Sequence, residues 1–222
     1  MTVVIPSRTG RRALSRSFAE VLSYPHASPV EAARRCADVA GTESEAAAAL
    51  LDAFVSLAEE TPLGTLQEEY TRTFDLDTMS RSQPTCYPYV GHYLFDESHK
   101  RGAFILGLKK RFRAAGFEDD SDLGDHLVVL LGFLGVCDDE TLASELVDDA
   151  ILPALRRMAI ASGTADERAS IRGAYLGVLR ALELSLGAGR PEPAEDPADD
   201  ETEREWLRDR DSLGIDRDWC GH

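Results

Sequence analysis

Apolar residues recur at helical spacing along most of the first 186 residues, and each recurrence predicts an α-helix with one buried face. The first stripe ends before Pro25 and comprises Leu14, Phe18, Val21 and Leu22. The second comprises Ala46, Ala49, Leu50, Ala53, Phe54 and Leu57. The third lies between Asp96 and Ala115 and comprises Phe104, Ile105, Leu108, Phe112 and Ala115. Gly116 follows this third helix and suits a left-handed C-cap.

The run from Leu127 to Leu134 is apolar on almost every side, which predicts a central helix surrounded by other helices. A buried strand is the alternative interpretation. We favour a helix because Ser121 and Asp122 can cap it, and because the chain has no second β-branched run to pair with a strand. Thr141 to Ile160 predicts another helix, in which Pro153 marks a kink or a restart. The last core helix is predicted from Ile171, Tyr175, Val178, Leu179 and Leu182.

Four capping boxes, in which Ser or Thr precedes Glu by three residues, predict where helices begin. They are Ser28 with Glu31, Thr42 with Glu45, Thr65 with Glu68, and Thr164 with Glu167. Together with the apolar stripes they predict an all-α fold. We expect a single globular helical-bundle domain of about eight or nine helices over residues 1–186.

The sequence changes character at Gly187. From there to Asp200 it has no large apolar residue and is rich in proline and carboxylates, which predicts a disordered acidic linker within residues 187–222. A short aromatic element follows, with Trp206, Leu207, Leu213, Ile215 and Trp219. This element can dock on the domain itself or on a partner, and docking on the domain is the simpler interpretation.

Composition narrows the function. The chain has 24 Lys and Arg against 40 Asp and Glu, a formal charge of −16, which disfavours nucleic acid as a partner. Four scattered cysteines, Cys36, Cys86, Cys137 and Cys220, indicate free thiols in a reducing cytosol. The longest apolar run has eleven residues, and a membrane-spanning helix needs about 20. We therefore expect a cytoplasmic protein without direct membrane insertion, in which Arg11-Arg12 is the solvated start of a helix and not part of an export signal.

Sequence motifs for nucleotide binding, hydrolysis or zinc proteolysis are absent, so these functions lose their usual sequence support, and we expect no bound cofactor. Cys86, His92 and His99 leave a metal site as an alternative, although ordinary surface positions for the two histidines are the simpler interpretation. Asp125-His126 opens the apolar helix, where a carboxylate is favoured by the helix dipole. A structural role is the preferred interpretation of this pair, and contact with a cationic or hydrogen-bonding ligand is the alternative.

Aromatic residues flank a turn-rich loop from Asp75 to Pro88. They are Tyr70, Phe74, Tyr87, Tyr89, Tyr93 and Phe95. Such residues usually pack a core, but the apolar body and polar tip of tyrosine also suit a groove that binds a peptide.

These residues belong to an ordered constellation that resembles the central pattern of a known family. It consists of Tyr70-x3-Phe74-Asp75, His92-Tyr93-Leu94-Phe95, Arg101-Gly102, Leu108, Gly116, Leu123-Gly124-Asp125-His126-Leu127 with Leu131 and Phe133, and Ile151-Leu152-Pro153-Ala154-Leu155. From Leu66 to Leu155 the chain thus resembles the redox-enzyme maturation chaperones of the TorD and DmsD class, and specifically the nitrate-reductase molybdenum-cofactor assembly type (NarJ). One departure is Gly124, where the family commonly has proline.

The resemblance implies an all-α, monomeric chaperone without catalysis. It would bind the N-terminal or leader segment of the apo catalytic subunit of a molybdoenzyme, nitrate reductase or a relative, and hold that subunit for cofactor insertion before membrane attachment or export. The client-binding residues that it implies are Tyr70, Phe74, Tyr93, Asp125 and His126. Arg101 and Gly102 are implied as a structural or groove pair, the arginine in an ion pair and the glycine in close helix packing.

The acidic balance of the chain fits this interpretation, since basic leader segments would be steered toward it. Dimerisation by exchange of helices stays open. Two other classes remain as alternatives. One is a helical metal- or cofactor-binding protein that uses Cys86, His92 and His99, and the other is a regulatory scaffold that acts through its C-terminal element.

Overall fold

A computed structural model of the chain describes residues 7–26, 28–74, 86–95, 98–118, 123–160 and 170–188. Within these ranges the regular structure is helical, apart from an isolated antiparallel bridge between Tyr89 and His126. The elements are α1 (Arg8–Val21), α2 (Pro29–Gly41), α3 (Glu45–Glu60), α4 (Leu63–Phe74), α5 (Val90–Leu94), α6 (Ser98–Ala114), α7 (Leu127–Leu134), α8 (Glu140–Glu145), the π-helical turn η1 (Leu146–Ile151), α9 (Leu152–Ile160) and α10 (Ile171–Gly187). The predicted all-α fold is confirmed.

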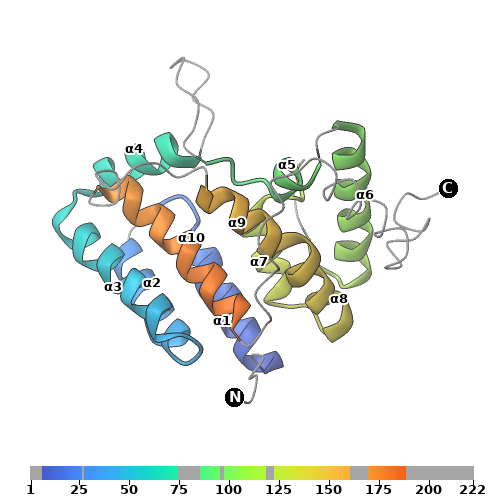
Figure 1. The fold of residues 1–222 in the computed structure, drawn as a ribbon, viewed down its shortest axis with the longest axis horizontal. Coiled ribbons are helices and arrows are strands. Elements are labelled where there is room, and N and C mark those ends of the chain that lie inside the picture. The colour runs from blue at the N-terminus through green and yellow to red at the C-terminus, as the bar shows by residue number, and fades with distance from the viewer. Residues whose placement is uncertain are drawn as a thin grey trace.

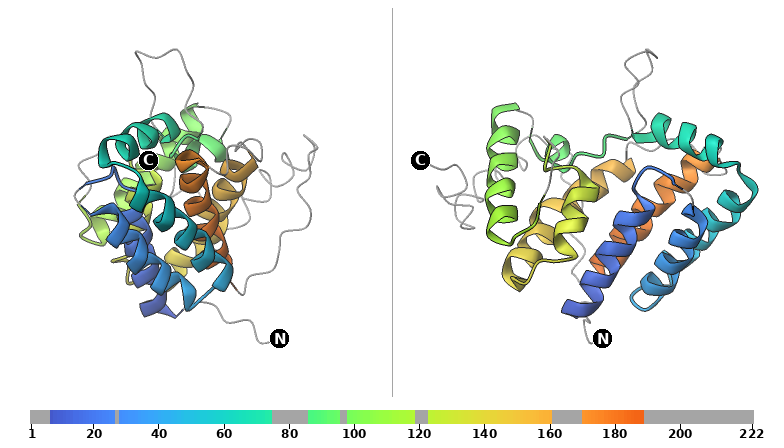
Figure 2. Two further views of the ribbon diagram at one scale, coloured as in Figure 1. Left: turned by 90° about the vertical axis from the view of Figure 1, so that its left-hand side faces the viewer. Right: turned by 180° about the vertical axis from the view of Figure 1, so that it is seen from behind.

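The helices form two neighbouring groups (Figures 1 and 2). In one group α3 packs against α2 and α10, and α1 packs against α2. In the other group α5 packs against α6 and α9, while α6 stands at the outer edge of the molecule. Helices α9 and α10 pack against each other and join the two groups, and α7 packs against α1.

Helix α7 is the central helix that its composition predicts. Its buried residues are Leu127, Leu130, Leu131, Phe133 and Leu134. The stripes of α1 and α10 are buried as well, and Phe54 of α3 meets Tyr175 of α10 edge to face at 5.0 Å between ring centroids. Helix α6 is followed by Gly116 with φ of 66°, which confirms the predicted left-handed position after this helix.

Helix starts differ from the predicted capping boxes at two places. The cap of α3 is Ser44, whose hydroxyl accepts from the Ala47 amide, because Thr42 belongs to the turn that ends α2. Helix α4 begins at Leu63, because the carbonyl of Pro62 accepts the first helical hydrogen bonds, so Thr65 lies inside the helix. Ser28 does stand before α2, although its side chain makes no cap hydrogen bond.

The predicted caps of two later helices lie outside the described residues. Helix α7 begins at Leu127 with His126 as its N-cap, whereas Ser121 and Asp122 lie outside the described residues. Ser170 caps α10, and Thr164 lies outside the described residues.

Pro153 lies in the second position of α9, directly after the π-helical turn η1. Proline has no N–H to donate and its ring crowds the carbonyl four residues earlier, so a wider turn just before it relieves both constraints. The predicted restart at this proline therefore takes the form of a π turn within one continuous helical segment, α8–η1–α9.

The prediction of a solvated Arg11-Arg12 pair is wrong. Arg11 is only 6% exposed and donates to the Leu134 carbonyl at 3.1 Å and to Glu140 at 3.0 Å. Arg12 donates to the carbonyls of Val136 and Cys137 at 2.8 and 3.2 Å. Carbonyl groups at the end of a helix lack helical partners and carry partial negative charge, so both guanidinium groups complement the end of α7.

Three cysteines, Cys36, Cys86 and Cys137, are free and buried, while Cys220 lies outside the described residues. No helix in the described ranges is both long and apolar enough to cross a membrane. The predicted acidic linker and aromatic element lie outside the described residues from Gly189 onward.

Candidate functional site

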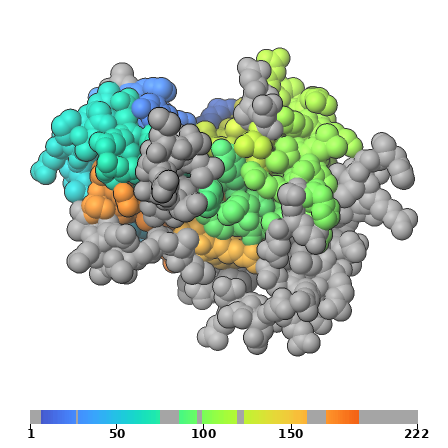
Figure 3. All heavy atoms as spheres, turned by 90° about the horizontal axis from the view of Figure 1, so that it is seen from above, coloured from blue at the N-terminus to red at the C-terminus, as the bar shows by residue number. Residues whose placement is uncertain are grey.

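An open groove of about 370 Å³ lies between the end of α1, helix α4 and the start of α7. Its lining residues are Ser23, Tyr24, Tyr70, Tyr89, Leu123, His126, Val128 and Val129. Figure 3 looks onto the side of the molecule that carries α4 and α5, with the blue and teal segments of one wall and the green segments of the other. Tyr24 and Leu123 are 45% and 39% exposed, so the groove presents large apolar side chains to solvent.

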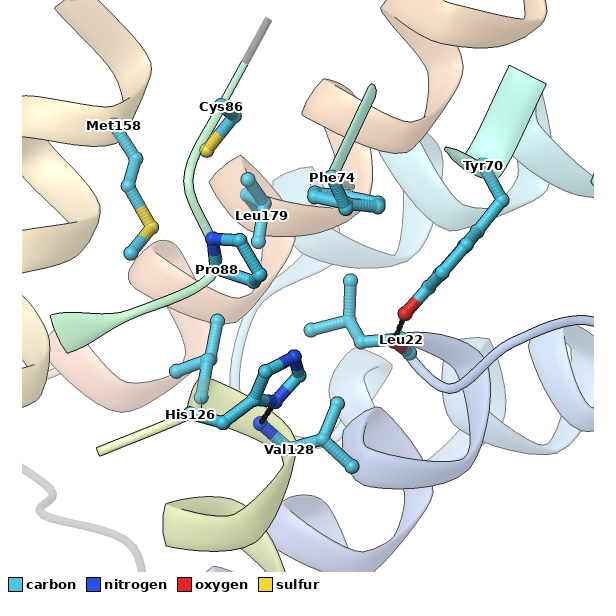
Figure 4. Close-up of a pocket in the computed structure, with 10 residues that line it drawn as sticks. Leu22, Tyr70, Phe74, Cys86, Pro88, His126, Val128, Met158 and Leu179 are labelled. Atoms are coloured by element: carbon cyan, nitrogen blue, oxygen red, sulfur yellow. Dashed lines mark hydrogen bonds between the residues drawn. The ribbon is translucent and has the colours of Figure 1, made fainter. Parts of the chain in front are cut away.

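A small cavity of about 10 Å³ lies beneath this groove, and Figure 4 shows its lining. Tyr70, His126 and Val128 line both the cavity and the groove. In Figure 4 the hydroxyl of Tyr70 points to the backbone of Leu22, and the His126 ring lies beside Val128. The three residues therefore form the floor between the open groove and the core.

Tyr70 is fixed from both ends. Its hydroxyl donates to the Leu22 carbonyl at 2.9 Å, and its ring meets Tyr24 edge to face at 5.6 Å. Phe74 stacks beneath it, 5.1 Å from the Tyr70 ring and 5.7 Å from Tyr175, and is 6% exposed. Tyr70 thus lies at the groove, whereas Phe74 lies in the core that supports it.

His126 is held by its place at the start of α7. Its Nδ1 accepts from the Val128 amide at 3.2 Å, as an N-cap does, and its ring meets Tyr89 edge to face at 5.3 Å. The bridge between these two residues is backed by hydrogen bonds from the Val90 amide to the Asp125 carbonyl and from the Leu127 amide to the Pro88 carbonyl. Tyr89 and His126 are therefore tied together through their backbones as well as their rings.

Asp125 does not line the groove. It is 0% exposed and precedes the N-cap of α7, and its two oxygens accept from Arg101 at 2.8 and 3.2 Å. The Arg101 guanidinium carbon also lies 5.2 Å from the centre of the Tyr89 ring, within the range of a cation–π contact. The expected ion pair of Arg101 is confirmed, and it connects Asp125 to a wall of the groove.

The close helix packing implied for Gly102 is wrong, because a Cβ there would meet nothing within 4 Å. The crowded glycine is Gly91, where a Cβ would lie 2.6 Å from Asp125 Oδ2 and 3.0 Å from Arg101 Cγ. The glycine that allows close packing beside the Arg101–Asp125 ion pair is thus Gly91 and not Gly102.

Tyr93 lies outside the groove lining and holds the backbone that leads to it. Its hydroxyl accepts from the Tyr87 amide at 3.1 Å and lies 3.6 Å from Cys86 Sγ, and Arg157 donates to its carbonyl. Burial raises the pKa of Tyr93, and it raises the pKa of Cys86 to about 11. Both groups are therefore neutral near pH 7.

Among the residues that the structure describes, no three His, Cys, Asp or Glu side chains converge as metal ligands would. Cys86 contacts Tyr93, and His92 packs on Tyr87 at 4.5 Å between ring centroids. Burial lowers the pKa of His92, and the charge of Arg101 lowers it further. His99 lies exposed on α6, so the metal set of Cys86, His92 and His99 is not assembled.

The structure thus brings two of the implied client-binding residues, Tyr70 and His126, to one groove, with the other three around it. The main groove residue that the sequence did not single out is Tyr24, while Leu123 belongs to the family pattern but was not among the implied client contacts. The position of Tyr24, between the end of the first helix and Pro25, could have marked it as a candidate. Its exposure, however, depends on how distant helices pack.

A family model described as the nitrate reductase delta subunit matches residues 38–160, more than half of the chain. The chain belongs to the nitrate reductase delta subunit family. It is therefore related to maturation chaperones of nitrate reductase. In this family member the matched range includes Tyr70, Tyr89, Leu123 and His126 of the groove, while Tyr24 precedes it. The curated proteins searched include no match.

Proposed function

We propose that this chain binds the N-terminal or leader segment of the apo catalytic subunit of a nitrate reductase or a related molybdoenzyme. It would hold that subunit for molybdenum-cofactor insertion before membrane attachment or export. The observation that carries this proposal is the open groove that exposes Tyr24 and Leu123 in a member of the delta subunit family.

The chemistry of the groove fits an amphipathic peptide. Its tyrosines offer apolar ring faces together with hydroxyl groups, and Leu123, Val128 and Val129 offer aliphatic contacts. The described lining includes no lysine or arginine. A chain of formal charge −16 attracts a basic segment at long range, and the apolar lining then retains it.

The residues fall into two roles in this proposal. Tyr24, Tyr89, Leu123 and His126 touch the peptide, whereas Asp125 is 0% exposed and acts through the Tyr89 wall. Tyr93 and Phe74 support the backbone and the floor. Compared with the residues that the family pattern implies, the proposed set of client contacts leaves out Asp125 and adds Tyr24.

The test is binding of a synthetic N-terminal peptide of the host's molybdoenzyme catalytic subunit, measured by calorimetry. Truncation of a residue at the centre of an interface costs about 1–2 kcal/mol, so Tyr24→Ala and Leu123→Ala should each weaken binding about 5–30-fold. Leu63→Ala is the matched control, because Leu63 is equally exposed, at 39%, and does not line the groove. Unchanged affinity in both groove variants would refute the site.

The client is identified by affinity purification from the host during respiratory growth, followed by mass spectrometry. Recovery of an apo molybdoenzyme catalytic subunit from the cytoplasmic fraction, and its loss with Tyr24→Ala, would support the proposal. Recovery that persists with both groove variants would place the contact elsewhere on the chain.

A further inference from the structure

The outer face of α6 differs from the rest of this acidic protein. Helix α6 contains six Lys or Arg and no Asp or Glu, whereas the whole chain carries a formal charge of −16. Five of its exposed residues, His99, Gly102, Leu106, Lys110 and Arg113, follow one another at steps of three or four, so they share one face. Helix α6 itself stands at the edge of the molecule (Figures 1 and 2).

Two features of this face are not explained by the stability of α6 itself. Leu106 is 48% exposed, the largest value among the exposed large hydrophobic residues of the described chain. Gly102 has open space around its Cβ position, so alanine would fit and would favour the helix. The missing side chain leaves a flat area beside Leu106 that a planar ring can cover.

The cations lie next to this flat area. Lys109, Lys110 and Arg113 form no ion pair with any residue that the structure describes, unlike Arg101, which holds Asp125. Cations in the last turns of a helix complement its dipole, which accounts for their position along the helix. The dipole does not account for an apolar residue exposed on the same face.

The chain carries a complementary segment in its own tail. Between Glu192 and Glu203 there are seven carboxylates and no lysine or arginine, and Trp206-Leu207 follows after Arg204-Glu205. An acidic segment followed by two large apolar residues matches, in reverse order, a helix face on which Leu106 is followed by Lys109 and Lys110.

The tail is long enough to reach this face. Trp206 lies 18 residues after Ala188, the last described residue. A chain of this length spans up to about 60 Å when extended, and a domain of roughly 180 residues has a radius of gyration of about 16 Å. Most of the surface of the domain is therefore within reach.

We propose that the acidic segment 192–203 binds the outer face of α6 in the same molecule. Its carboxylates pair with Lys109, Lys110 and Arg113, and Trp206 covers Leu106 beside Gly102. The tail thereby shields a basic and apolar surface that would otherwise attract other acidic chains. This contact is independent of the groove and of the client.

The two tryptophans of the chain, Trp206 and Trp219, both lie in the tail, so tryptophan fluorescence of the full chain reports on the tail alone. With Trp219→Phe, the emission and acrylamide quenching of Trp206 measure its shielding. We expect emission at short wavelength and weak quenching. Leu106→Asp and Lys110→Glu should each shift emission to longer wavelength and increase quenching, while Lys110→Arg should not.

Leu63→Asp is the matched control, because it places the same charge at another exposed leucine. High salt should weaken the shielding, since surface ion pairs are screened. Free access of acrylamide to Trp206 in the parent chain would overturn the proposal. Shielding of Trp206 that survives both α6 variants would also overturn it. Shielding that Tyr24→Ala removes would place the tail in the groove instead, and shielding that is lost on dilution would assign the contact to a second copy of the chain.

Discussion

Arg101 holds both carboxylate oxygens of Asp125, at 2.8 and 3.2 Å, and its guanidinium carbon lies 5.2 Å from the centre of the Tyr89 ring. One side chain therefore joins a fully buried carboxylate to an aromatic wall of the groove. The family pattern implies contact between the client and Asp125, but the geometry makes Asp125 a positioning residue. Its effect on binding then passes through Tyr89.

Asp125→Asn should destabilise the fold by about 2–3 kcal/mol in urea unfolding. Removal of one partner of a buried ion pair costs about 3–5 kcal/mol, and we expect a value at or below the lower end because the Arg101 side chain is 26% exposed and stays partly hydrated. Peptide affinity provides the second measurement. The losses from Asp125→Asn and Tyr89→Ala should not add in the double variant, and full additivity would mean that Asp125 touches the client directly.

Gly91→Ala should destabilise the protein, whereas Gly102→Ala should stabilise it by up to about 1 kcal/mol through helix propensity. The new Cβ at residue 91 would lie 2.6 Å from Asp125 Oδ2, and the one at residue 102 would meet nothing within 4 Å. Thermal unfolding by circular dichroism compares the two directly. Equal effects of the same sign would show that the close approach at Gly91 is not the cause.

Tyr93→Phe should cost about 1 kcal/mol or more, because the Tyr87 amide loses the hydroxyl that accepts its hydrogen bond at 3.1 Å. Peptide affinity should change little in the folded variant, since Tyr93 does not line the groove. Tyr24→Phe is the comparison, because it removes a hydroxyl at the groove. A tenfold loss of peptide affinity in Tyr93→Phe with unchanged stability would show that Tyr93 contacts the client directly.

The free energy of unfolding should fall as pH rises above about 9, where unfolded thiols begin to ionise. Burial raises the pKa of Cys36 to about 12 and that of Cys86 to about 11, so the folded protein keeps both protons while the unfolded chain loses them. The stabilising contribution is complete below the unfolded pKa and is lost as pH approaches the folded values. Urea unfolding at pH 7 and pH 10 measures the change, which Cys36→Ala should reduce.

Much of the fold follows from local sequence because most helices bury a periodic stripe. The predicted stripe of α3 is wrong in that only its Phe54 is fully buried, because α3 buries the neighbouring face with Ala47, Leu51, Val55 and Ala58. The central helix Leu127–Leu134 and the stripe of α10 are read directly from their apolar residues. The residue at which a helix begins is harder to predict than its buried face. The Ser or Thr before Glu pattern arises by chance, and neighbouring residues such as Ser44 and Pro62 compete for the same position.

The site is predictable only in part, because it depends on contacts between distant segments. Tyr70 and His126 are identified by the family pattern, but the exposure of Tyr24 and Leu123 is set by how α1, α4 and α7 meet. Burial of Asp125 likewise requires Arg101, which lies 24 residues away. A local sequence pattern cannot predict a contact between two residues that lie this far apart in the chain.

The contact of Arg11 and Arg12 with the end of α7 has a consequence for how the chain is made. Arg11 and Arg12 leave the ribosome before the carbonyls that they bind, which lie 123 to 125 residues further along the chain. Helix α1 can pack against α2 early, but it lacks its contacts with α7 until that helix has been synthesised. The packing of α1 is therefore completed only after a long stretch of chain has emerged, and long-range contacts of this kind slow folding.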